Sequence, residues 1–138
     1  RCYQEYFKTL AAMARTGFAQ IAAHPDIIKI FSIDYFRNWL RGSEARGLVR
    51  AALTAVKDSG MAMEISSAGL RKPCREIYPG PELMEMAREL DLPVTISSDA
   101  HNTADLMYGF DDLIAYAREY GYTSSVYVAD GKMHSLPF

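Results

Sequence analysis

Asp99 and His101 are the pair of residues in this sequence best suited to binding a metal ion. They lie in the Ser-Ser-Asp-Ala-His run at 97–101, directly after an apolar segment. A carboxylate and a neutral imidazole in an irregular segment can converge on one cation, and both are ordinary ligands of zinc, iron and manganese. The alternative is that Asp99 caps a following helix beside an exposed His101. We favour the metal site, because the pair follows the end of a predicted strand.

His24 is a weaker candidate for the same chemistry. It ends the apolar segment 18–23 and is followed by Pro25 and Asp26. A histidine in such a place is more often a hydrogen-bonded core residue than a ligand, so both interpretations stay open. The third histidine, His134, is expected at the surface in a short polar tail.

Charged residues also accompany the segment 61–66, which we interpret as a strand. Glu64 lies inside it and would need a partner if it were buried. It could instead be exposed at an edge, pair with Arg71 or Lys72, or order a ligand residue. Arg71 follows in a glycine-containing loop, where a guanidinium could hold a phosphate through two hydrogen bonds. An isolated Arg-Lys pair is also typical of solvated surface.

An alternation of helices and strands positions these residues. Apolar spacing and stop signals predict helices at 3–14, 43–57, 81–90 and 110–120. Short apolar runs predict strands at 18–23, 61–66, 93–97 and 124–129. Four helix-then-strand units predict an α/β fold with a parallel sheet and helices outside it. The candidate residues then lie at the carboxyl ends of strands, where such folds assemble active sites.

The composition is that of an ordinary globular protein, with 49% hydrophobic and 23% charged residues and a formal net charge of −2. No basic cluster indicates a nucleic-acid partner, and no apolar run is long enough to cross a membrane. The two cysteines lack metal-binding spacing, which is typical of reduced thiols in a cytoplasmic protein. The chain begins inside a helical pattern, so we expect 138 residues of a longer protein.

Four segments, in this order, resemble the later motifs of the PHP-family histidinol-phosphatases. They are His24-Pro25-Asp26-Ile27-Ile28-Lys29, the run from Met63 to Lys72, Ile77-Tyr78-Pro79, and Ser98-Asp99-Ala100-His101. The resemblance covers essentially the whole chain, and the ordered set is more specific than any one motif. It implies a distorted seven-stranded TIM-like (β/α) barrel. Residues 1–138 would be a single partial PHP domain, the C-terminal half of that barrel, with the missing N-terminal half as its partner.

The resemblance also implies metal-dependent hydrolysis of a small phosphomonoester, L-histidinol phosphate, in histidine biosynthesis. Up to three divalent metals (Zn, Fe or Mn) would be bound, and His24, Asp99 and His101 match ligands of different metals. Asp99 would also act catalytically by positioning the nucleophile. The other ligands would come from the N-terminal half, so the chain alone is expected to be inactive. Its open sheet edges would make it prone to self-association.

Three residues would contact the substrate by the same resemblance: Arg71 and Lys29 at the phosphate, and Ser66 nearby. Ser66 departs from the family pattern, because asparagine often stands there and serine has a shorter reach and no amide donor. A PHP phosphoesterase acting on another ester, such as a nucleotide, therefore stays open. A half-barrel that has lost catalysis and serves as a binding or assembly module is a third interpretation. An upstream His-x-His motif would separate an enzyme from a module.

Overall fold

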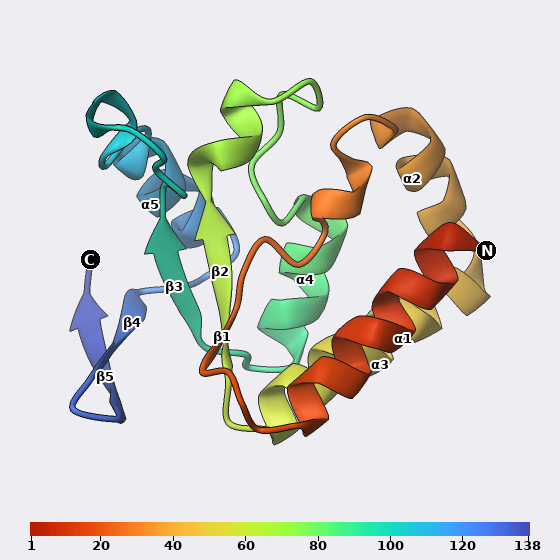
Figure 1. Cartoon of the computed structure of the whole chain (residues 1–138), viewed down its shortest axis with the longest axis horizontal. Helices are drawn as coiled ribbons and strands as arrows, with labels where there is room; N and C mark the ends of the chain where they lie inside the picture. The colour runs from red at the N-terminus through yellow and green to blue at the C-terminus, as the bar shows by residue number, and fades with distance from the viewer.

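A three-stranded parallel sheet and the helices packed around it form the centre of the molecule (Figure 1). The computed structural model describes residues 1–138 throughout. In chain order the elements are α1 (Cys2–Arg15), β1 (Ile21–Ala22), η1 (Ile27–Lys29), α2 (Ile33–Leu40), α3 (Ser43–Asp58), β2 (Ala62–Ser66), η2 (Ser67–Arg71), α4 (Pro81–Glu89), β3 (Val94–Ser97), η3 (Thr103–Asp105), α5 (Phe110–Glu119), β4 (Ser124–Ala129) and β5 (Lys132–Pro137).

β2 is the middle strand of the parallel sheet, in the order β1-β2-β3. Ala22 lies opposite Met63, and Ser66 lies opposite Ser97. Every residue of β2 is buried, as expected for a strand with neighbours on both sides and covered faces. The loops that follow β1, β2 and β3 leave the sheet at the same edge, the upper one in Figure 1.

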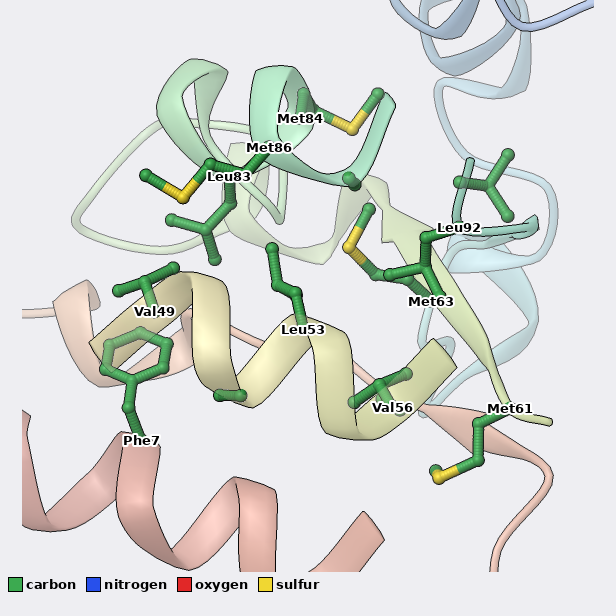
Figure 2. Packing of buried hydrophobic residues seen from close by; sticks show 14 of the residues in the cluster. Phe7, Val49, Leu53, Val56, Met61, Met63, Leu83, Met84, Met86 and Leu92 are labelled. Atoms are coloured by element: carbon green, nitrogen blue, oxygen red, sulfur yellow. The ribbon is translucent and has the colours of Figure 1, made fainter. Parts of the chain in front are cut away.

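The hydrophobic core lies between the sheet and helices α1, α3 and α4. Phe7 of α1 and Leu53 of α3 are fully buried, as is Met63 of β2 (Figure 2). Leu53 projects from α3 towards Leu83 of α4, so one residue joins two helices across the core. Fully burying an apolar side chain of this size stabilises a fold by about 1.5–3 kcal/mol. The core formed with helices α1, α3 and α4 therefore stabilises the central strand β2.

The four predicted helices are confirmed, as are the strands at β2, β3 and β4. The first predicted strand, 18–23, is reduced to Ile21–Ala22. Gly17 has a positive φ of 71°, and Phe18 beyond it is 90% exposed, so the chain joins the sheet late. The short helix α2 was not predicted. It packs Phe36 and Leu40 into the core.

The prediction of a fourth parallel strand is wrong. β4 pairs antiparallel with β5, and the two form a separate sheet. The turn between them is Asp130-Gly131, and both residues have positive φ, which favours a tight hairpin. The expected polar tail is therefore a strand. His134 on β5 is exposed, as predicted, and its ring stacks on Tyr127 at a centroid distance of 5.2 Å.

The fold is thus mixed α/β with a parallel sheet. None of its helices combines the length and the apolar character needed to cross a membrane.

Candidate functional site

The candidate residues lie in three loops at one edge of the sheet, as the strand assignments predicted. His24 follows β1, Arg71 ends the η2 turn after β2, and Asp99 and His101 follow β3. Ser66 is the last residue of β2. No three His, Cys, Asp or Glu side chains of this chain are grouped closely enough to hold a metal ion by themselves.

Glu64 holds the backbone of His24 in place. The His24 N–H donates a hydrogen bond of 2.7 Å to Glu64 Oε2, and Glu64 is only 7% exposed. His24 has a φ of 31°, in a region that a residue with a side chain seldom adopts. A hydrogen bond to a charged group contributes about 1.5–3 kcal/mol, enough to offset such backbone strain. Of the roles considered for Glu64, the structure therefore favours ordering a candidate ligand.

The His24 ring presents a nitrogen that the protein leaves without a partner. Nδ1 is buried and has no hydrogen-bond partner, while the ring makes a T-shaped contact with the Tyr78 ring at a centroid distance of 6.4 Å. Leaving a buried polar atom unpaired costs about 1–3 kcal/mol. A nitrogen kept in this state fits a metal ligand, because coordination would provide the missing partner.

The loop after β3 prepares Asp99 and His101 for the same chemistry. The Asp99 N–H donates to Ser97 Oγ at 3.0 Å, and Asp99 has a positive φ of 49°. His101 Nδ1 lies 2.8 Å from the carbonyl oxygen of Asp99. A carbonyl oxygen can only accept, so Nδ1 carries the proton in a neutral ring and Nε2 keeps its lone pair. This is the tautomer that coordinates a metal through Nε2.

Arg71 is held by the loop that carries Asp99 and His101. Its Nη2 donates to the carbonyl oxygen of Ser98 at 2.6 Å, and its Nε lies 3.5 Å from Asp105 Oδ1. The guanidinium carbon lies 4.9 Å from the centroid of the Tyr108 ring. Nη1 is buried and has no hydrogen-bond partner. Arg71 therefore lies beside the candidate metal ligands, whereas its neighbour Lys72 is exposed.

Lys29 occupies a different environment from the one predicted. It is 1% exposed, and its Nζ lies 2.6 Å from Asp26 Oδ2 and 2.5 Å from Glu76 Oε1. A third contact, at 3.3 Å, goes to the carbonyl oxygen of Ile77. An ammonium group has three donors, and three protein acceptors surround this one. The geometry does not favour the predicted contact between Lys29 and a phosphate.

Ser66 is also enclosed by the protein. It is fully buried, and its Oγ accepts the Ala68 N–H at 3.2 Å, which caps the η2 turn. Its backbone exchanges two hydrogen bonds with Tyr78. The hydroxyl group therefore has a local structural partner, and the geometry does not favour the predicted contact between Ser66 and a substrate.

Sequence reasoning missed the charged cluster around Lys29. Burial raises the pKa of Asp26 more than Lys29 and the Gly80 N–H lower it. Glu76 joins Lys29 to Arg37, and a Cβ at Gly80 would lie 2.5 Å from Glu76 Oε1, so a larger residue there would displace the Glu76 carboxylate. The three-residue spacing of Asp26 and Lys29 was a usable signal, since such pairs often meet on one turn.

Comparison with known proteins finds relatives that share more than the fold. The chain is 31% identical over 119 residues to a Deinococcus radiodurans protein named probable histidinol-phosphatase, covering 86% of this chain and 43% of that protein. It is 33% identical over 67 residues to the Bacillus subtilis histidinol-phosphatase, covering 48% of this chain and 25% of that protein. The chain thus spans less than half the length of the curated relatives it matches. No family model matches the sequence.

A crystal structure from Listeria monocytogenes, provisionally assigned as a histidinol phosphatase, has a similar fold. Its TM-score is 0.68, with 23% identity over 78% of this chain and 42% of that one. At this identity the likeness concerns the fold alone. The ordered motifs indicated a resemblance to the histidinol-phosphatases, and the sequence relatives confirm it.

Proposed function

The chain is a relative of the histidinol-phosphatases, and we propose that it contributes part of a metal-dependent phosphomonoesterase site for L-histidinol phosphate. One observation carries this proposal. Two buried nitrogens at the same edge of the sheet, His24 Nδ1 and Arg71 Nη1, have no partner in the protein. One suits a metal ion and the other suits a phosphate oxygen, which are the two components of such a site.

The metals would be divalent zinc, iron or manganese, up to three in number, with His24, Asp99 and His101 among their ligands. Bound there, they would polarise the phosphoryl oxygens and lower the pKa of a water molecule. Glu64 holds the backbone of His24, and the Asp99 carbonyl oxygen sets the tautomer of His101. These contacts prepare the ligands in advance, which lowers the cost of ordering them.

Arg71 would bind the phosphate through its free Nη1 and neutralise part of its negative charge. The partly buried guanidinium would bind an anion more strongly than an exposed one, because an electrostatic contact weakens in water. Asp99 would hold a metal and orient the attacking nucleophile. The substrate would be a small phosphate ester, since no basic surface of the chain indicates a polymer.

We further propose that residues 1–138 form the C-terminal half of a distorted seven-stranded TIM-like barrel, as one partial domain. Parallel strands with helices outside them support this, as does the partial coverage of the relatives. The N-terminal half would supply the remaining ligands. The chain alone is then expected to be inactive and to self-associate. A cytoplasmic location agrees with the two free cysteines, Cys2 and Cys74.

The decisive experiment is a substrate panel on the protein encoded by the whole reading frame that contains this chain. Phosphate release would be measured from L-histidinol phosphate, a nucleoside monophosphate and p-nitrophenyl phosphate, with metal content determined in parallel. We expect kcat/KM for L-histidinol phosphate to exceed the others by about tenfold or more. We also expect a chelator to abolish activity and added manganese or zinc to restore it.

A preference for the nucleotide would contradict the proposed substrate but keep the proposed chemistry. Bound metal without hydrolysis of any ester would favour the non-catalytic module. Absence of both metal and activity would contradict the proposal as a whole.

A further inference from the structure

The loop between β3 and α5 not only carries Asp99 and His101 but also encloses the side chain of Arg71. We propose that Asp105 and Tyr108 in this loop are positioning residues that aim the Arg71 guanidinium at the phosphate. The inference rests on the proposed function, because only there is Arg71 a phosphate-binding residue.

Three contacts restrain the guanidinium in three different ways. The Ser98 carbonyl oxygen accepts a hydrogen bond of 2.6 Å from Arg71 Nη2, and Asp105 Oδ1 lies 3.5 Å from Arg71 Nε. The Tyr108 ring lies against the guanidinium, 4.9 Å from its central carbon, and limits its tilt. Every one of these contacts comes from the loop after β3, although Arg71 itself belongs to the turn after β2.

The contacts leave one donor group unused. Nη1 is buried without a partner, and the single carboxylate beside the cation stays beyond normal hydrogen-bond length at 3.5 Å. An arginine with a purely structural role is expected to have each buried nitrogen paired, because a buried donor without a partner is costly. The guanidinium is thus oriented by its ion pair with Asp105, while Nη1 stays available for an anion.

Asp105 and Tyr108 are themselves anchored. Asn102 Oδ1 accepts the Asp105 N–H at 3.1 Å, and Asn102 Nδ2 donates to Asp105 Oδ2 at 2.8 Å. This leaves Asp105 Oδ1 to face Arg71. The Ser67 hydroxyl donates to the Tyr108 carbonyl oxygen at 2.5 Å. The two loops are thereby joined, and the direction of Arg71 depends on the loop that presents the candidate metal ligands.

The test follows the Arg71 Nε–H by NMR in the protein encoded by the whole reading frame that contains this chain, with inorganic phosphate as the probe. Asp105→Asn removes the charge, and Tyr108→Leu removes the ring. Asp111→Asn, an exposed acid on α5, and Tyr108→Phe, which keeps the ring, are the matched controls. We expect the Nε–H exchange rate to rise about tenfold in the two test variants. The change in the Arg71 Nε–H chemical shift that phosphate causes in the unaltered protein should be smaller in both test variants. The two control variants should match the unaltered protein in both measurements.

A second arm measures steady-state kinetics of the same full-length protein. Asp105→Asn and Tyr108→Leu should raise KM for the phosphomonoester and the inhibition constant of inorganic phosphate by about three- to tenfold. Their kcat and metal content should stay within about twofold of the parent. Asp105→Glu should raise KM less than Asp105→Asn does, because it keeps the charge.

The inference is overturned if the Arg71 Nε–H is unchanged in both test variants, or if phosphate does not perturb it in the unaltered chain. It is also overturned if the variants lose metal and kcat while KM is unchanged. If the NMR arm succeeds and no phosphate ester is hydrolysed, the proposed function fails while Asp105 and Tyr108 still position Arg71 for an anion.

Discussion

Lys29 and Arg71 are two basic residues in the loops at the same edge of the sheet, but their surroundings differ in kind. Lys29 meets two carboxylates and a carbonyl oxygen, so each of its donors is taken. Arg71 meets one carboxylate at 3.5 Å and one carbonyl oxygen, and it keeps a buried nitrogen free. The comparison teaches that burial of a charge does not by itself indicate function. A buried donor left without an acceptor is the stronger indication.

The largest expected effect comes from Lys29→Met. Removing the ammonium leaves the fully buried Asp26 without its cation and Glu76 with Arg37 alone. Breaking a buried ion pair by removing one partner costs about 3–5 kcal/mol. Urea denaturation should show this as a lower free energy of unfolding. Lys8→Met is the matched control, because the Lys8–Glu5 pair is exposed and should contribute less than about 0.5 kcal/mol. Equal losses of stability in the two variants would contradict the expectation that the buried Lys29 pairs stabilise the fold more than an exposed ion pair does.

Arg71→Met should have the opposite effects to Lys29→Met, with a small change in stability and a large loss of activity. The free energy of unfolding should change by less than about 1 kcal/mol, because the native guanidinium already lacks a full set of partners. In the complete enzyme, kcat/KM should fall about 100-fold, or about 2.7 kcal/mol in transition-state stabilisation. Arg71→Lys should not restore it, since an ammonium lacks the planar fork. A large loss of stability with normal kinetics would place Arg71 in the same class as Lys29.

Variants of Glu64 test whether this buried acid orders the candidate ligand His24 through its backbone. Glu64→Ala removes the acceptor of the His24 N–H and should cost about 1–3 kcal/mol. Glu64→Gln keeps an acceptor oxygen and should recover at least half of that loss. Thermal unfolding measures both variants, and the His24 amide resonance reports the hydrogen bond directly. An unmoved resonance in Glu64→Ala would contradict the role assigned to Glu64.

The smallest expected effect belongs to Lys72→Ala. Lys72 is adjacent to Arg71 but exposed, so its removal should change stability by less than about 0.5 kcal/mol and kcat/KM by less than about twofold. The same two measurements used for Arg71 apply. A loss approaching that of Arg71→Met would mean that general positive charge in the loop, not the position of one guanidinium, attracts the phosphate.

Much of the central fold could be predicted from local pattern. The helix with Phe7, Ala11 and Ala14 has an apolar face that the sequence spacing displays, and Gly17 ends its segment. The run at β2 is apolar enough to indicate a buried strand in spite of Glu64. The hairpin was missed because an apolar run does not specify its pairing partner. The Asp130-Gly131 turn was visible, but the polar strand after it resembled a tail.

The site was predictable to the level of strand ends and no further. The positions of His24, Asp99 and His101 follow from the end of each parallel strand, which sequence patterns locate well. The surroundings of Lys29 depend on Glu76, a residue 47 positions away, and contacts of that separation leave no local trace. The same is true of Arg71 and Ser98, which are 27 positions apart. Charge type could be read from the sequence, whereas the number of available acceptors could not.

The bond from His101 Nδ1 to the Asp99 oxygen has a practical consequence, because that oxygen belongs to the main chain. Replacing the Asp99 side chain would remove one carboxylate and leave the bond that sets the state of the imidazole. The contributions of the two residues can therefore be dissected one at a time, although they are separated by a single alanine.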